Sequence, residues 1–234
     1  MIFIRSLVFL VIQSLITPLF TLFAILSFPL HPITRYRIIS GWALSVMWLL
    51  RVLCDIRLEV RGAENIPTQP AILLCKHQSA WETIALQKVF PPQVWVLKKE
   101  LLWLPFFGWG LAMTSPIAIK RSDGKGAIKQ LLKQGKERLD MGFCVVIFPE
   151  GTRMPFGQRG KYKVGGALLS SSTGVPVVPI AHNAGKLWGR NSFLKRPGVI
   201  TMSIGAAISP EGLKADEINR RAEEWIETEV GRIN

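Results

Sequence analysis

A histidine and a glutamate five residues apart, His77 and Glu82, are the first residues whose types and spacing could do chemistry. They lie in KHQSAWE at positions 76–82, directly after an apolar run at 71–75 that is typical of a strand. Imidazole has an ordinary pKa of about 6.5, so its neutral form can take a proton from an attacking hydroxyl near pH 7. The imidazolium that forms needs a carboxylate to orient and stabilise it. The pair therefore suits general-base catalysis, with His77 as the base.

The five-residue spacing limits how the two side chains can meet. On one continuous helix, five residues turn through roughly 500°, which leaves the side chains about 140° apart. They can meet if His77 precedes a helix and Glu82 lies in its first turn, and Ser79 is a good N-cap for such a helix. Ser79-x-x-Glu82 is also a capping box, in which Glu82 merely bonds the backbone N–H of Ser79. On these residues alone, the catalytic pair and the capping box are equally good interpretations.

A second motif, FPEGTR at 148–153, follows another apolar run at 143–148. A glycine at a strand end lets the backbone approach a ligand closely, and an arginine can bind a phosphate through two hydrogen bonds. Gly151 and Arg153 therefore suit a phosphate site, with a plain turn and a solvated arginine as the alternative. The same two interpretations hold for Arg159, Lys161 and Lys163 in the glycine-containing loop that follows.

Together the two motifs resemble the glycerolipid acyltransferase family, in particular its bacterial 1-acylglycerol-3-phosphate acyltransferases. The resemblance runs from about residue 60 to residue 184 in four ordered blocks. GAENIP at 62–67 leads into the histidine motif, and KEL at 99–101 opens a second block that ends at Arg121. FPEGTR forms the third block and VPVVP at 175–179 the fourth.

The resemblance implies a role for each matching residue. His77 would be the general base and Glu82 its partner, although the family usually has the shorter aspartate at that position. The block at 175–179 would help shape the acyl-donor site. No metal site and no cofactor is implied. The site for the glycerol phosphate would be formed by Arg121, Glu150, Gly151, Thr152 and Arg153.

The implied reaction joins a thioester to a lysophospholipid. Acyl-CoA or acyl-carrier protein would donate an acyl group to the sn-2 hydroxyl of 1-acylglycerol 3-phosphate (lysophosphatidic acid), giving phosphatidic acid. One alternative is another acceptor, such as glycerol 3-phosphate or a lyso-aminolipid. The other is a non-catalytic membrane-binding protein on the same fold. A serine hydrolase is disfavoured because the chain has no G-x-S-x-G motif, and neither H-E-x-x-H nor a Cys/His cluster indicates a metal site.

Seven short apolar runs and two amphipathic stretches must position these residues. The stretches 126–140 and 214–230 have apolar residues at helical spacing, and Lys129, Lys133 and Lys136 lie on the polar side of the first. Strands that alternate with helices predict an α/β fold with a mixed, mostly parallel sheet flanked by helices. The strands are expected at 57–60, 71–75, 94–97, 117–120, 143–148, 175–181 and 199–204.

The N-terminus predicts a membrane-associated helical segment. Residues 6–30 carry no charged side chain and are long enough to span a bilayer, which needs about 20 residues, although Pro18 should kink the helix. A signal peptide is disfavoured because no A-x-A site follows. A second run at 38–50 is too short to cross alone and should dip into the bilayer, with a buried helix of the soluble domain as the alternative. We expect a membrane anchor at 1–54, either a helical hairpin or a transmembrane segment, and an acyltransferase domain at 55–234.

The net charge of +13, from 29 Lys and Arg against 16 Asp and Glu, indicates an anionic partner. The apolar N-terminus favours membrane lipid over nucleic acid. Arg35 and Arg37 precede the second run and Arg51 follows it, and basic flanks stay cytoplasmic. We therefore expect a cell-membrane protein with its catalytic domain on the cytoplasmic face.

Overall fold

The computed structural model describes residues 1–120 and 123–233, and a seven-stranded sheet forms its centre. The strand order is β1-β7-β6-β2-β5-β3-β4. The pairs β2–β5, β2–β6, β3–β5, β3–β4 and β1–β7 are parallel, whereas β6 and β7 are antiparallel, so β1 and β7 run against the other five strands. The strands are β1 (Ile56–Arg61), β2 (Ile72–Cys75), β3 (Gln93–Lys98), β4 (Ile117–Ile119), β5 (Cys144–Ile147), β6 (Val177–His182) and β7 (Gly198–Ile204). This confirms the predicted mixed, mostly parallel sheet.

Each of the seven predicted apolar runs overlaps a strand. The central strands β2, β5 and β6 are buried along their whole length. Continuous apolar runs are expected for strands covered on both faces, because no side of such a strand meets water. The structure differs mainly at the ends, where the run at 143–148 becomes Cys144–Ile147 and the run at 175–181 becomes Val177–His182.

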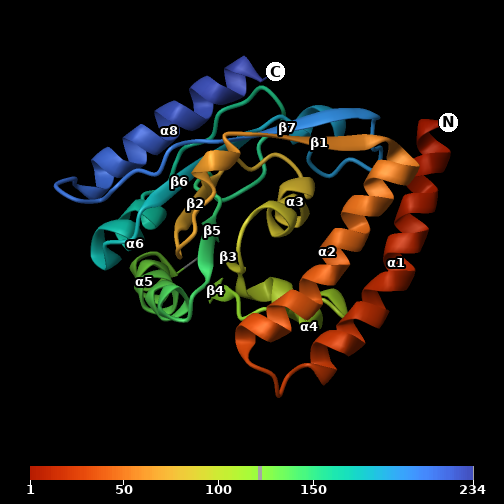
Figure 1. Ribbon diagram of the computed structural model, residues 1–234, viewed down its shortest axis with the longest axis horizontal. Coiled ribbons are helices and arrows are strands. Elements are labelled where there is room, and N and C mark those ends of the chain that lie inside the picture. The colour runs from red at the N-terminus through yellow and green to blue at the C-terminus, as the bar shows by residue number, and fades with distance from the viewer. Residues whose placement is uncertain (121–122, 234) are drawn as a thin grey trace.

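Helices cover both faces of the sheet (Figure 1). The helices α5 (Lys125–Asp140), α6 (Gly165–Thr173) and α8 (Ala215–Arg232) lie on one side. The helices α1 (Ile2–Leu26), α2 (Pro32–Cys54) and α3 (Trp81–Val89) lie on the other. Shorter elements are α4 (Phe107–Ala112), α7 (Ala184–Leu187) and the 3₁₀ turns η1 (Ala63–Asn65) and η2 (Lys99–Trp103). The two predicted amphipathic helices are α5 and α8, so both predictions are confirmed.

Helix α6 could not be read from residue preferences. It begins with Gly165 and Gly166 and ends in a run of hydroxyl residues, all weak helix formers. Close packing explains the glycines, because a Cβ at position 166 would lie 2.6 Å from Cδ2 of Leu74. Tertiary contact with β2 therefore favours this helix against local preference.

Helices α1 and α2 form an N-terminal hairpin. Both are long and apolar enough to cross a membrane, by length and composition. Helix α2 spans 23 residues, so it is longer than the predicted apolar run at 38–50; the side chain of His31 accepts the N–H of Ile33 at its start. Helix α1 continues through Pro18 and ends before Pro29.

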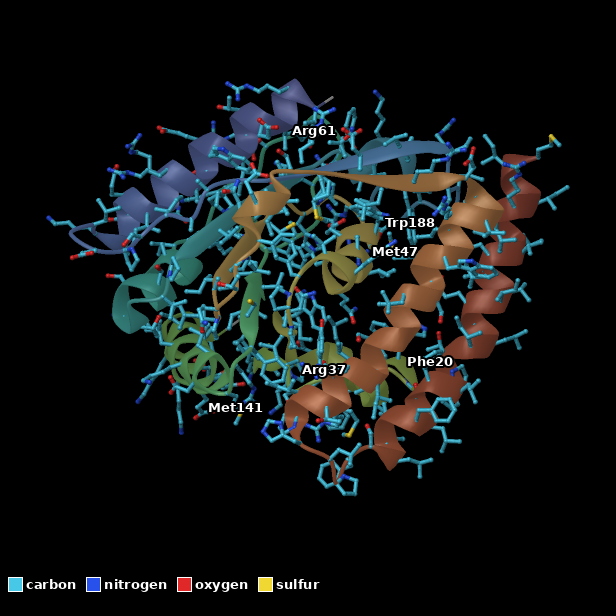
Figure 2. The ribbon with its side chains drawn as sticks, in the orientation of Figure 1. Phe20, Arg37, Met47, Arg61, Met141 and Trp188 are labelled. Carbon is cyan, nitrogen blue, oxygen red and sulfur yellow. The ribbon has the colours of Figure 1, made fainter. Side chains whose placement is uncertain are left out.

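The two hairpin helices differ in burial. Helix α2 packs on α3, and its inner residues, among them Ala43, Val46 and Leu50, belong to the same hydrophobic core as the sheet. Helix α1 is mostly exposed on its outer side, where Leu15 is 70% exposed. Figure 2 shows Met47 and Trp188 between the hairpin and the sheet, and the outer side chains of α1 pointing away from the domain.

Candidate active site

His77 and Glu82 meet in the connection between β2 and α3. His77 precedes the helix and Glu82 lies in its first turn, as the spacing requires. Oε1 of Glu82 lies 2.7 Å from Nδ1 of His77. The same carboxylate accepts the backbone N–H groups of Ser79 (2.9 Å) and Gln78 (3.0 Å), while Oγ of Ser79 accepts the N–H of Trp81. The Glu82 contact with the Ser79 N–H that a capping box contains and the His–Glu contact therefore exist together. The predicted N-cap Ser79 is not confirmed, because the N-cap of α3 is Ala80, which makes no side-chain cap hydrogen bond.

The His77 ring is held in one orientation. It stacks on Phe148 with ring centroids 4.0 Å apart and planes 13° from parallel, and its side chain is 14% exposed. A carboxylate can only accept, so the short contact requires Nδ1 to donate its hydrogen to Glu82. In the neutral ring the lone pair is then on Nε2, which is the state a general base needs.

The Glu82 carboxyl is fully buried, and its surroundings favour the charged form. Burial alone would raise its pKa, but the hydrogen bonds from His77 and the Ser79 N–H, together with the nearby His182 ring, lower the pKa of Glu82 below its ordinary value. The carboxylate is therefore present at neutral pH. A buried charge of this kind is tolerated only where hydrogen bonds satisfy it.

His182, at the end of β6, is buried and neutral. Its Nε2 donates to the carbonyl of Lys76 (2.8 Å) and its Nδ1 accepts the N–H of Ala184 (3.2 Å). Burial lowers the pKa of His182, which fits this bonding pattern, because a protonated ring could not accept. Both ring nitrogens are occupied, so His182 supports the strand ends.

The FPEGTR motif forms the turn after β5. Gly151 has φ +70°, a conformation that side chains rarely adopt, and a Cβ there would come 2.9 Å from Nζ of Lys163. Arg153 is half-buried and lines the same cavity as His77. Thr152 is exposed. The turn thus brings Arg153 to the carboxyl edge of the sheet, beside the cavity that His77 also lines, and places Gly151 against Lys163.

Glu150 points the other way. Its side chain is fully buried, and Oε1 pairs with Nζ of Lys76 at 2.7 Å and accepts the N–H of Gly160. Oε2 accepts the backbone N–H of His77 at 3.0 Å. Both oxygens are therefore used inside the protein. Glu150 therefore contacts the histidine loop, whereas the family resemblance implied a contact with the glycerol phosphate.

An apolar cavity of about 340 Å³ opens beside His77 and Arg153. This is within the size range of small-molecule sites. Its wall includes Thr17 and Phe20 of α1, Trp42 of α2 and Trp95 of β3. The N-terminal hairpin, expected to be only an anchor, thus contributes directly to the cavity next to the histidine.

Two other expectations for the site have different outcomes. Arg121, the second predicted phosphate-binding arginine, lies outside the residues that the structure describes. The block at 175–179 belongs mainly to β6, in the middle of the sheet, and none of its residues is among those that line the cavity. Its position explains why: a strand buried on both faces contributes to the core.

Two groups of residues near the site were missed. Lys76 pairs with two glutamates, one of them 151 positions away on α8, and the cavity wall on α1 and α4 comes from segments far from both motifs. The charge of Lys76 beside His77 was the only feature of the sequence that could have indicated a buried ion pair, and it does not indicate which acidic residue pairs with the lysine. Within residues 1–120 and 123–233, no three His, Cys, Asp or Glu side chains lie together as a metal site would require.

The fold and the site thus define an α/β protein with a histidine–carboxylate pair at the carboxyl edge of its sheet. The acyltransferase family model matches residues 57–183, more than half of the chain and the region that holds both motifs. The chain belongs to the acyltransferase family.

Individual relatives agree with this assignment. Over 217 residues the chain is 50% identical to the 1-acyl-sn-glycerol-3-phosphate acyltransferase of Pseudomonas aeruginosa, covering 89% of this chain and 84% of that protein. Over 201 residues it is 30% identical to 1-acyl-sn-glycerol-3-phosphate acyltransferase alpha of Mus musculus, covering 83% and 70%. The fold matches the crystal structure of the 1-acyl-sn-glycerophosphate (LPA) acyltransferase PlsC from Thermotoga maritima. The TM-score is 0.80 at 21% identity, over 98% of this chain and 94% of the other.

Proposed function

We propose that this enzyme transfers an acyl group from a thioester to the sn-2 hydroxyl of 1-acylglycerol 3-phosphate, giving phosphatidic acid. The observation that carries the proposal is the 2.7 Å contact between His77 and Glu82 at the mouth of an apolar cavity that Arg153 also lines. A base, a cation and an apolar space suit an acceptor that has a hydroxyl, a phosphate and an acyl chain. The names of the relatives described above support this acceptor.

The chemistry proceeds by direct transfer. Nε2 of His77 takes the proton of the acceptor hydroxyl while the oxygen attacks the thioester carbonyl carbon. Glu82 stabilises the imidazolium that forms. The C–S bond then breaks, and the thiolate leaves with the proton that the imidazolium returns. The nearby Cys75 thiol is no nucleophile in this scheme, because burial raises its pKa and keeps it protonated.

Binding of the two substrates is divided between the turn and the cavity. Arg153 donates charge-assisted hydrogen bonds to the acceptor phosphate, with Gly151, Thr152 and Arg121 as the further predicted contributors. The apolar cavity takes an alkyl chain. Acyl-CoA or acyl-carrier protein supplies the thioester as a co-substrate, and the reaction needs no cofactor. Glu150 has a positioning role, because its carboxylate would repel a phosphate and instead bonds the backbone of His77.

The outer surface of the hairpin supports a membrane location. Exposed leucines and phenylalanines follow the outer side of α1, and α4 packs beside α1. Residues 101–109 continue this surface with Trp103 at 77% exposed and Trp109 at 47%. Tryptophan favours the membrane interface. We propose that residues 1–54 and this segment contact the cell membrane and that the domain at 55–234 lies on its cytoplasmic face.

Thiol release tests the function. The purified protein is mixed with an acyl-CoA and either lysophosphatidic acid, glycerol 3-phosphate or a lyso-aminolipid, and free coenzyme A is measured; acyl-carrier protein replaces CoA in a parallel series. Release that depends on lysophosphatidic acid, with phosphatidic acid as product, is the expected result. Release with another acceptor alone would change the substrate, and no release with any pair would favour a non-catalytic membrane protein.

A further inference from the structure

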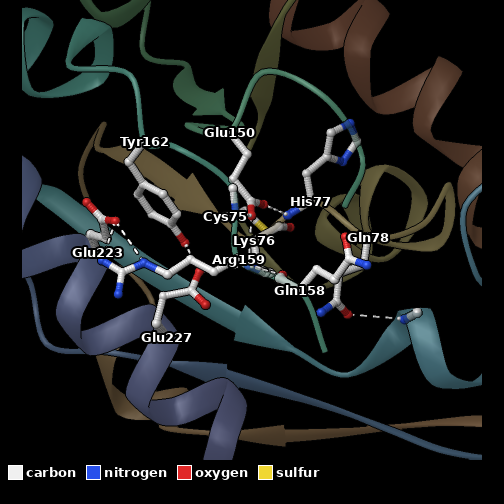
Figure 3. Close-up of polar contacts among 12 residues, drawn as sticks. Cys75, Lys76, His77, Gln78, Glu150, Gln158, Arg159, Tyr162, Glu223 and Glu227 are labelled. Carbon is white, nitrogen blue, oxygen red and sulfur yellow. Dashed lines mark hydrogen bonds and ion pairs between the residues drawn. The ribbon is translucent and has the colours of Figure 1, made fainter. Parts of the chain in front are cut away.

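A buried lysine connects the histidine loop to the C-terminal helix. The Lys76 side chain is fully buried, and its Nζ bonds Oε1 of Glu150 at 2.7 Å, Oε1 of Glu227 at 2.7 Å and the carbonyl of Gln158 at 3.2 Å. These three contacts use the three donors of an ammonium group. Figure 3 shows Lys76 between the two glutamates, with the His77 ring turned away from them.

The contacts continue from Lys76 to the backbone of His77. Glu150, held by Lys76, accepts the N–H of His77 at 3.0 Å, and the carbonyl of His77 accepts the N–H of Met154 at 2.7 Å. The carbonyl of Lys76 accepts Nε2 of His182. Both peptide groups that flank the Cα of His77 are therefore held. Glu150 links the first of these peptide groups, through the His77 N–H, to the lysine.

Glu227 is the member of this network that comes from outside the acyltransferase motifs. It lies on α8, beyond the residues 57–183 that the family model matches. Its side chain is 17% exposed, and its Oε1 also accepts the hydroxyl of Tyr162 at 2.8 Å. Burial and the carboxylate of Glu227 raise the pKa of Tyr162, so that hydroxyl stays protonated and donates.

Glu150 and Glu227 contribute differently to the charge balance around Lys76. Lys76 and Glu150 alone balance each other, so loss of the Glu227 charge leaves no unpaired charge behind. Loss of Lys76 would leave two carboxylates that shared one cation, which is costly in a buried site. Glu227 is therefore dispensable for charge balance. Its effect is to fix the position of Nζ, and through it the position of Glu150.

We propose that Glu227 is a positioning residue for acyl transfer: through Lys76 and Glu150, helix α8 sets the backbone of His77 and hence the direction of its base nitrogen. This inference rests on the proposed function. A displacement of about 1 Å at a catalytic group can cost roughly 100-fold in rate. A change at Glu227 should therefore act on turnover and leave substrate binding alone.

Glu227→Gln tests the proposal, because it removes the charge and keeps the shape. Glu223→Gln is the matched control: Glu223 lies one turn away on α8 and pairs with the exposed Arg159 of the same loop, at 2.6 Å, without contacting Lys76. We expect kcat to fall about ten- to a hundredfold in Glu227→Gln, with KM for both substrates and the melting temperature near wild type. The control should stay within about twofold of wild type, as expected for an exposed pair.

The outcomes separate a positioning role from a structural one. If kcat of Glu227→Gln stays within about fivefold of the control, or if the melting temperature falls while kcat per folded enzyme is unchanged, the proposal is wrong. Should Glu227→Gln not fold, Glu227→Asp carries the same test, because the shorter side chain keeps the charge but withdraws from Nζ. Wild-type protein is included in every assay. If the proposed function itself is wrong, the wild-type protein shows no turnover, whatever the variants do.

Discussion

The carboxylate of Glu82 lies 2.7 Å from Nδ1 of His77, and it reaches the ring from the first turn of α3. The same carboxylate accepts two backbone N–H groups of the loop before the helix. One side chain thus orients the imidazole and holds the backbone of the loop before the helix. Charge and hydrogen-bond acceptance at position 82 can therefore be separated by substitution.

Glu82→Gln should lower kcat about 10²–10⁴-fold with little change in melting temperature. The amide oxygen can still accept the N–H of Ser79, so the helix start survives. The amide nitrogen, however, donates toward Nδ1 and favours the ring tautomer with hydrogen on Nε2, which is no base. Kinetics and thermal melting check this. Glu82→Leu, which also removes the acceptor of the Gln78 and Ser79 N–H groups, should lose stability as well as activity. Normal turnover in the glutamine variant would exclude Glu82 from the catalytic pair.

His77→Ala should reduce kcat about 10²–10⁴-fold while the protein stays folded, because general-base catalysis is commonly worth that factor. The backbone contacts of His77 with Glu150 and Met154 do not involve the ring, so they persist in the variant. Thiol release and a thermal melt measure the two effects. Activity near wild type in the alanine variant would contradict the mechanism.

Arg153→Ala should raise KM for lysophosphatidic acid by roughly ten- to a hundredfold, since a charge-assisted hydrogen bond contributes about 1.5–3 kcal/mol. KM for the thioester should change little. Arg159→Ala is a suitable control, because Arg159 lies in the same loop but pairs with Glu223 at the surface. The phosphate assignment fails if only the thioester KM moves.

Much of the sheet could be predicted because its central strands are buried on both faces. Runs such as 71–75 and 143–148 are apolar throughout, and each leads directly into one of the two motifs. The spacing of His77 and Glu82 also predicted that the two side chains can meet only if the histidine lies outside the helix. The structure has this arrangement. Local patterns sufficed wherever neighbours in sequence are also neighbours in space.

The remaining features depend on contacts between distant segments. Lys76 and Glu227 are 151 positions apart and meet only because α8 packs against β6. Glu150 was expected to face substrate because of its motif, yet the position of Lys76 beneath it turns the carboxylate inward. Neither the charge of a residue nor the periodicity of apolar residues in the sequence indicates which of the 16 acidic residues pairs with a given lysine.

Stability should fall as the pH drops from about 6.5 toward 5, and His182 should account for part of this fall. Burial lowers the pKa of His182 in the folded protein, so below about pH 6.5 the unfolded chain binds a proton that the folded chain does not. Stability therefore decreases with falling pH, by at most about 1.4 kcal/mol per pH unit for one such group. The lowered pKa of Glu82 acts only below about pH 4.3, where its stabilising charge is lost.

Replacing His182 by glutamine isolates this contribution. Glutamine does not titrate, and its amide can still donate toward the carbonyl of Lys76. The variant should show a flatter dependence of melting temperature on pH between 7 and 5, each protein being compared with its own value at pH 8. An unchanged slope would mean that folding does not change the proton affinity of this ring, so that His182 does not contribute to the fall in stability.

The membrane prediction needs a variant that leaves the fold intact. Deleting residues 1–54 does not qualify, because α2 contributes Ala43, Val46 and Leu50 to the core of the sheet domain. Substitutions on the exposed side of α1 avoid this problem. Leu15, Leu19 and Leu22 are 70%, 51% and 51% exposed, so the combined Leu15→Ser, Leu19→Ser, Leu22→Ser variant removes apolar surface without opening the core.

The wild-type protein should remain on anionic vesicles in high salt, whereas the triple serine variant should be released. Burying a leucine in an apolar medium contributes about 1.5–3 kcal/mol and does not depend on salt, while the attraction of basic residues to anionic lipid is screened. A matched control changes three exposed apolar residues elsewhere, Ile128, Met141 and Val199, to serine and should bind like wild type. Sedimentation with vesicles at low and high salt measures the difference. If high salt alone removes the wild-type protein from the vesicles, the anchor is electrostatic. If the control variant is released as readily as the α1 variant, the exposed side of α1 is not the membrane-binding surface.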